Sequence, residues 1–148
     1  MTAPVPTRGL AHIGIRVHDT DRSVKFYSMF GFVKTMGPIG PENVVIMEHP
    51  SGLELNLIVN APNAKEPNVL MDVPEKHPGI THVALLCPDI LAAKASLEVQ
   101  GISLSGGPVQ FGPHAKGIFV RDPDGNVIEF SWNQKVYAKV RELWGSRS

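Results

Sequence analysis

At 148 residues, with 43% hydrophobic and 19% charged side chains, the chain has the size and composition of one globular domain, residues 1–148. Fourteen basic residues balance fourteen acidic ones, which argues against a nucleic-acid partner and gives no polybasic signal for a membrane surface. The lone Cys87 excludes an intrachain disulfide framework, and no apolar run reaches the ~20 residues of a membrane-spanning helix. Because the N-terminus lacks a signal-peptide pattern, we expect a cytoplasmic protein.

An internal repeat organises the chain. Residues 8–32 align with residues 78–102 at a constant offset of seventy positions. Both copies predict a strand, then a helix that follows an aspartate cap, then a glycine that ends the helix. The offset superposes four pairs of residues: Gly9 on Gly79, His12 on His82, Asp19 on Asp89, and Gly31 on Gly101.

The rest of each copy predicts three more strands. The last strand of each follows a turn signal, HPSG in the first copy and DPDG in the second. Each module therefore reads strand–helix–strand–strand–strand, and a proline-containing linker joins the two. The predicted later strands are 32–36, 44–48 and 53–59, then 102–105, 117–121 and 126–132; module one is 8–60, the linker 61–77 and module two 78–133.

Residues 134–144 predict a C-terminal helix. Val136, Val140, Leu143 and Trp144 lie near one face of it. Covering the core of its own domain is the expected role, and a dimer contact is the alternative.

One histidine or glutamate stands on the polar face of the first and last strand of each module. Because strand side chains alternate, His12, Glu54, His82 and Glu129 each lie opposite an apolar face. A single such residue usually faces water. The histidines recur at the offset of the repeat, and we interpret the two glutamates as equivalent as well. We therefore expect all four side chains to converge on one concave surface. Carboxylates that converge repel unless a cation lies between them, and imidazole with carboxylate suits Zn, Ni, Co, Mn or Fe.

The motifs HIGIRV, RSVKFYSMFGF, LELNL, HVAL and DPDGNVIEF resemble those of the vicinal oxygen chelate superfamily (glyoxalase/bleomycin resistance/dioxygenase) over residues 8–133. The ligand pattern His12, Glu54, His82 and Glu129 is similar to that of bacterial-type glyoxalase I, the lactoylglutathione lyase. The resemblance implies an α+β fold in which two tandem βαβββ modules form a curved mixed β-sheet around a concave metal site, with helices on the outer face. It also implies a homodimer.

The resemblance further implies a metal-dependent lyase of the glyoxalase I type. Such an enzyme isomerises a hemithioacetal or related small carbonyl compound through a metal-bound enediolate, with one divalent ion: Zn, Ni or Co, with Mn or Fe also accepted. Glu129 is the expected base, and Glu54 a ligand that assists it. The alternatives are another metal-dependent enzyme of the superfamily (an epimerase, isomerase or dioxygenase) and a metal-free binding or resistance protein.

Four further residues are candidates for substrate binding. Arg16 matches the arginine that anchors a glutathione carboxylate in glyoxalase I, and an ordinary ion pair at a strand edge is the alternative. Asn56 and Asn60 share the face of the first-module glutamate, and Lys116 lies in the Gly- and Pro-rich segment GPVQFGPHAKG. Ile58 stands where glyoxalase I commonly has Asn, so whether the small-molecule substrate is a glutathione adduct stays open.

Overall fold

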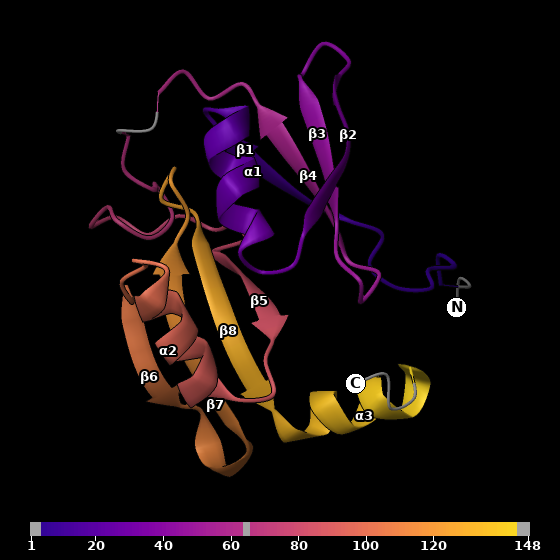
Figure 1. The fold of residues 1–148 in the computed structure, drawn as a ribbon, viewed down its shortest axis with the longest axis vertical. Helices are drawn as coiled ribbons and strands as arrows, with labels where there is room; N and C mark the ends of the chain where they lie inside the picture. Colours follow the sequence, from indigo (N-terminus) through magenta and orange to yellow (C-terminus); the bar gives the residue numbers. More distant parts are fainter. Residues whose placement is uncertain (1–3, 64–65, 145–148) are drawn as a thin grey trace. The chain divides into compact units, whose positions relative to one another are not determined.

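The computed structural model describes residues 4–63 and 66–144. The chain forms two compact units, Met1–Glu66 and Pro67–Ser148, and their boundary falls within the predicted linker. Each unit contains one βαβββ module, which confirms the predicted α+β class (Figure 1). Each module has its own four-stranded mixed sheet, where the sequence predicted one sheet. None of the helices in the described part of the chain has the length and apolar content needed to cross a bilayer.

The helices and strands follow the predicted order. The first unit contains β1 (Ile13–Val17), α1 (Thr20–Ser28), β2 (Val33–Ile39), β3 (Val44–Glu48) and β4 (Glu54–Val59). The second unit contains β5 (His82–Leu86), α2 (Ile90–Val99), β6 (Gly106–Gln110), the short 3-10 turn η1 (Gly112–His114), β7 (Ala115–Arg121), β8 (Val127–Asn133) and α3 (Gln134–Trp144).

The two sheets have the same topology. Their strand orders are β1-β4-β3-β2 and β5-β8-β7-β6. In each, the first strand pairs in parallel with the last, and the other pairs are antiparallel. The last strand of a module is therefore the immediate neighbour of the first, so side chains far apart in sequence share a patch of sheet.

The two main helices begin and end where their local signals predict. The Asp19 side chain accepts a 2.8 Å hydrogen bond from the amide three residues later, and Asp89 does the same at 3.0 Å. Gly31 and Gly101 adopt φ angles of +90° and +76°, in the left-handed region that ends helices at little cost only for glycine. These caps confirm the repeat in the backbone.

Each sheet packs against the helix of its own module on one face. More buried and more exposed side chains alternate in β1, β3, β4 and β5, with the apolar residues on the helix side and most polar ones on the other face, here called the open face. In β8, by contrast, Val127, Ile128, Glu129 and Phe130 are all buried. The buried apolar residues are Ile15, Val17, Phe26, Tyr27, Phe32, Val45, Met47, Leu55 and Leu57 in the first unit, and Ile90, Leu97, Ile118, Val120, Val127, Ile128 and Phe130 in the second.

Strand β6 lies four residues later than the predicted strand at 102–105. The Ile102 amide donates to the Leu97 carbonyl at 2.9 Å, so the chain is still closing α2 at that point. The sequence GGPVQ forms the strand instead, with a cis bond between Gly107 and Pro108. The prediction was wrong because Gly and Pro usually interrupt strands, whereas an edge strand such as β6 tolerates them.

Helix α3 has the predicted bounds but not the expected role. Val136 and Val140 are 47% and 36% exposed, so this part of the helix does not bury the predicted apolar stripe in the core. The side chains of Leu143 and Trp144 lie outside the described residues.

The turn before β8 is held by a buried carboxylate. Asp122 is only 4% exposed, and its Oδ1 accepts hydrogen bonds from the amides of Asp124 (2.9 Å) and Asn126 (2.8 Å). Because β8 begins directly after this turn, Asp122 fixes where its side chains lie.

Replacing Asp122 with Ala is expected to lower the free energy of unfolding by about 2–3 kcal/mol, since two part-buried amides lose a charged acceptor. Urea denaturation measures the loss. The control is Asp72→Asn, which weakens a half-exposed ion pair to Arg121 (2.8 Å) and is expected to cost about 1 kcal/mol or less. Equal losses in the two variants would contradict the assigned role of the turn.

Candidate metal centre

A histidine and a glutamate meet on the open face of the second sheet. In the parallel pairing of β5 and β8, His82 lies opposite Val127 and Ala84 lies opposite Glu129. His82 and Glu129 are therefore diagonal neighbours on one face. Nε2 of His82 lies 3.1 Å from Oε2 of Glu129.

The local structure orients both side chains. Glu129 is nearly buried, with 9% of its side chain exposed, whereas 39% of the His82 side chain is exposed. Nδ1 of His82 lies 2.9 Å from Oγ1 of Thr81. In the tautomer that donates this hydrogen bond, Nε2 is left as the lone-pair donor, which is the usual arrangement of a metal-binding histidine.

The pair fits two ligands of one divalent ion. A carboxylate oxygen and an unprotonated imidazole nitrogen are both acceptors, so their approach requires a shared proton or a cation. Metal–ligand bonds of about 2.0–2.2 Å put neighbouring ligand atoms roughly 3–3.6 Å apart, which matches the observed 3.1 Å. Within the described ranges, no cluster of three or more His, Cys, Asp or Glu is present.

Two phenylalanines and a glycine shape the surroundings of Glu129. Phe119 lies opposite Glu129 on β7, and its ring centroid is 6.0 Å from that of His82 and 6.5 Å from that of Phe111. A Cβ at Gly117 would lie 2.7 Å from Oε1 of Glu129. The carboxylate therefore occupies space that only a glycine leaves free. The sequence predicted no role for Gly117 or Phe119.

The predicted ligands of the first unit lie at one end of its sheet. His12 directly precedes β1 and is exposed, and Glu54 is the half-buried first residue of β4. Continuing the β1–β4 register one position beyond Ile13 and Leu55 places His12 opposite Glu54. On its other side, Glu54 lies opposite Glu48 of β3.

The two glutamates are not equivalent in the repeat, so that interpretation of the sequence was wrong. In the second unit Ala84, two residues after His82, lies opposite Glu129. In the first unit Gly14, two residues after His12, lies opposite Asn56 and not Glu54. Glu54 stands two residues earlier along β4. The metal-binding role of Glu54 itself stays a prediction.

Two predicted substrate-binding residues of the first unit contact one another. Nε of Arg16 donates to Oδ1 of Asn60 at 2.9 Å, and Nδ2 of Asn60 donates to Oε2 of Glu42. Glu42 lies in the turn between β2 and β3 and was not among the predicted residues. The sequence could not reveal this contact because no local pattern links the turn to β4.

Lys116 lies in a strand, β7, although its Gly- and Pro-rich sequence segment is typical of a loop. In β7 it pairs with Trp132, and its face is that of Ile118 and Val120, which are buried on the helix-covered side. Glu129 belongs to the opposite face, so the register does not bring Lys116 to the histidine–glutamate pair.

Cys87 follows β5 and does not have the properties of a nucleophile. Burial raises the pKa of its thiol, because desolvation disfavours the thiolate. Its Sγ donates a 3.3 Å hydrogen bond to the Asp89 carbonyl. A structural role is the consistent assignment.

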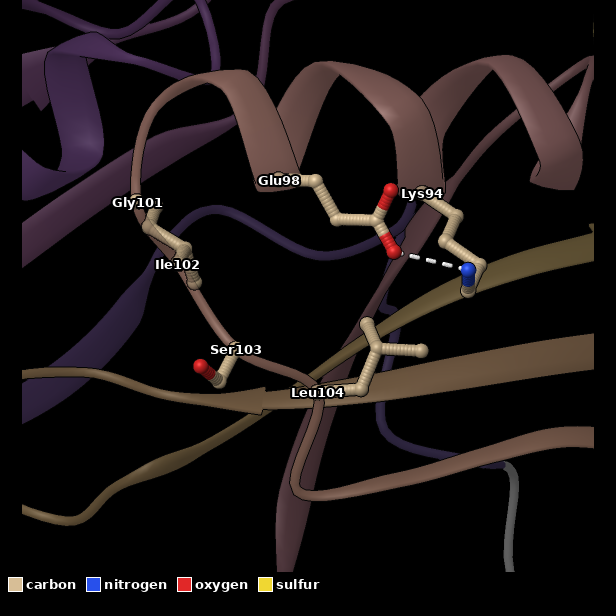
Figure 2. Close-up of a pocket in the computed structure, with 6 residues that line it drawn as sticks. All are labelled: Lys94, Glu98, Gly101, Ile102, Ser103 and Leu104. Carbon is tan, nitrogen blue, oxygen red and sulfur yellow. Dashed lines mark hydrogen bonds and ion pairs between the residues drawn. The ribbon is translucent and has the colours of Figure 1, made fainter.

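A cavity of about 400 Å³ lies beside the end of α2 in the second unit (Figure 2). Its titratable groups, Lys94 and Glu98, neutralise one another in an ion pair of 2.7 Å. It is therefore a poorer candidate for chemistry than the open face. The remaining lining residues are Gly101, Ile102, Ser103 and Leu104.

Known proteins share both the sequence pattern and the fold. The model of the Glyoxalase/Bleomycin resistance protein/Dioxygenase superfamily matches residues 9–130. Glyoxalase domain-containing protein RDO1 of Mycosarcoma maydis is 32% identical over 136 residues, which cover 84% of this chain and 68% of that protein. A glyoxalase/dioxygenase from Nostoc punctiforme has a TM-score of 0.69 at 23% identity, over 90% of this chain and 96% of that one. TnmS3, an antibiotic binding protein from Streptomyces sp. CB03234, has a TM-score of 0.65 at 19% identity, over 87% and 98%.

Proposed function

The chain belongs to the glyoxalase/bleomycin resistance/dioxygenase superfamily, and from this premise we propose that it is a metal-dependent lyase of the glyoxalase I type. The observation that carries the proposal is the 3.1 Å approach of His82 Nε2 to Glu129 Oε2 on an open sheet face. His82 and Glu129 would supply two of the metal ligands, and the sequence predicts His12 and Glu54 as the other two. The ion is Zn, Ni or Co, with Mn or Fe also suited to these donors.

Glu129 performs the proton transfer in the proposed reaction. It takes the proton from the carbon next to the substrate carbonyl and returns it to the former carbonyl carbon. The hydroxyl proton passes to the former carbonyl oxygen, and the hemithioacetal is thereby converted to a thioester. The metal, when bound, acts as a Lewis acid for the negative charge that develops on the two substrate oxygens. Because only 9% of the Glu129 side chain is exposed, the transferred proton is shielded from bulk water.

A metal-free binding protein is the second candidate. Phe111 and Leu86, which are 46% and 37% exposed in the second unit, offer apolar surface to a ligand. The antibiotic binding protein TnmS3 shows that the fold also serves binding. Such a role needs no metal and gives no reason for Glu129 to be buried beside a histidine.

Metal titration separates the two candidates. We expect metal-free protein to bind one equivalent of Ni²⁺, Co²⁺ or Zn²⁺ per chain, and His82→Ala to weaken this binding at least about tenfold. The control is His77→Ala, which removes an exposed imidazole of the same unit and leaves binding unchanged. Wild-type protein that binds no metal, or binding that survives His82→Ala, would refute the metal centre.

An activity assay then identifies the reaction. Loaded protein is expected to isomerise the adduct of methylglyoxal and glutathione. Protein that binds metal through His82 but leaves this adduct unchanged would be another metal enzyme of the superfamily: an epimerase, an isomerase or a dioxygenase.

A further inference from the structure

Phe111 lies beside the carboxylate of Glu129 on the open face of the second sheet. A Cβ at Gly117 would be 2.7 Å from Oε1 of Glu129 and 3.2 Å from Cε2 of Phe111, so the two side chains meet over the same glycine. The other oxygen of Glu129, Oε2, lies 3.1 Å from Nε2 of His82. One carboxylate oxygen therefore faces the histidine, and the other faces the phenylalanine.

The hairpin between β6 and β7 fixes the position of Phe111. Its amide donates a 2.8 Å hydrogen bond to the Ala115 carbonyl, and Nε2 of Gln110 donates to the Gly112 carbonyl at 2.6 Å. Its ring meets that of Phe119 edge to face, with the centroids 6.5 Å apart and the planes at 82°. The ring is thus held in place, yet 46% of the residue is exposed. An aromatic side chain that is fixed before binding loses little entropy when an apolar group covers it.

A row of uncharged residues extends this surface across the sheet. Successive cross-strand partners in the row are Leu86, Ser131, Gly117 and Val109. Leu86 and Val109 are 37% and 39% exposed. Glu129 belongs to the adjacent row of the same face, so the apolar surface begins directly beside its carboxylate. Single exposed apolar residues are common, whereas several that share one face mark a binding surface.

We propose that Phe111 determines substrate specificity: it contacts the group carried by the substrate carbonyl, and the preferred group is a phenyl ring or an alkyl group of similar size. This inference rests on the proposed function. The carbonyl group is bonded to the carbon that gives its proton to Glu129, and Oε1 of Glu129 faces Phe111. The substituent therefore lies within reach of the ring. A methyl group leaves most of the ring in water, whereas a phenyl group covers it and gains hydrophobic and aromatic contact.

The first test measures binding without turnover. Benzohydroxamate and acetohydroxamate present the same two adjacent oxygens to a metal and differ only in a phenyl or a methyl group. Calorimetry with cobalt-loaded wild-type protein is expected to show about tenfold tighter binding of benzohydroxamate. Phe111→Ala should reduce this ratio to about threefold or less, and Phe111→Leu should keep an intermediate ratio because it retains an apolar side chain.

The second test measures kcat/KM for the glutathione adducts of phenylglyoxal and methylglyoxal. Wild type is expected to prefer the phenyl adduct about tenfold, and Phe111→Ala to lose most of this preference. The control is Leu91→Ala, which removes an apolar side chain that is 74% exposed on α2. It should leave both ratios unchanged. Circular dichroism checks that every variant folds.

The possible outcomes separate this inference from the proposed function. A benzohydroxamate preference that survives Phe111→Ala, or its absence in wild type, would overturn the role of Phe111 and leave the lyase intact. The expected hydroxamate ratios without turnover of either adduct would support the role of Phe111 in binding and refute the lyase reaction. Wild-type protein that binds no Co²⁺ would overturn both.

Discussion

Replacing Glu129 with Gln is expected to lower kcat for isomerisation of the methylglyoxal–glutathione adduct by about 10²–10⁴-fold. The amide keeps the size and shape of the side chain but cannot take a proton from carbon. The variant should fold, since Gln can still form a hydrogen bond to His82, 3.1 Å away. Steady-state kinetics at saturating metal measures the loss, and circular dichroism reports the fold.

The matched control for this substitution is Glu98→Gln. Glu98 is a carboxylate of the same unit, but it pairs with Lys94 at 2.7 Å on α2, on the helix side of the sheet. Its replacement should leave kcat unchanged. If Glu129→Gln kept wild-type activity on every substrate of the enzyme, Glu129 would not be the base.

Introducing a single methyl group at Gly117 should damage the centre without unfolding the protein. The new Cβ would lie 2.7 Å from Oε1 of Glu129, which is closer than real side chains approach. Because the carboxylate is the end of a flexible side chain, it can move aside, and the free energy of unfolding should change by no more than about 1 kcal/mol. The displaced oxygen no longer meets the metal, so we expect Gly117→Ala to weaken Co²⁺ binding at least about tenfold.

Gly106→Ala is the control for the methyl group. Gly106 lies on the neighbouring strand β6, and a Cβ there would be 3.5 Å from the Phe119 ring, an ordinary contact. This variant should bind metal like wild type. If Gly117→Ala bound Co²⁺ as tightly as wild type, the carboxylate of Glu129 would not need the space beside Gly117. That result would argue against Glu129 as a metal ligand.

The helices could be predicted because their signals are local. Asp19 and Asp89 act within the first turn, and Gly31 and Gly101 act at the last. Strand β6 could not be predicted in this way. It contains a Gly-Pro pair that locally disfavours a strand, and it exists because its edge position lets it pair with β7.

The candidate site was predictable only in part, for the same reason. His12 and His82 could be matched because they and the residues around them are related by the same offset of seventy positions. The last strands follow a different offset, seventy-three positions between Pro50 and Pro123, so matching by residue type paired Glu54 with Glu129. Only the strand register identifies Asn56 as the counterpart. Thr81 and Gly117 were missed because a hydrogen-bond partner and a space around a carboxylate leave no pattern in sequence.

An X-ray structure of the cobalt-loaded protein, recorded at the cobalt absorption edge, tests the central claim most directly. Two ligands of one ion predict an anomalous peak about 2.0–2.2 Å from both Nε2 of His82 and Oε2 of Glu129. Cobalt bound only elsewhere, with His82 and Glu129 still in direct contact and no peak between them, would contradict it.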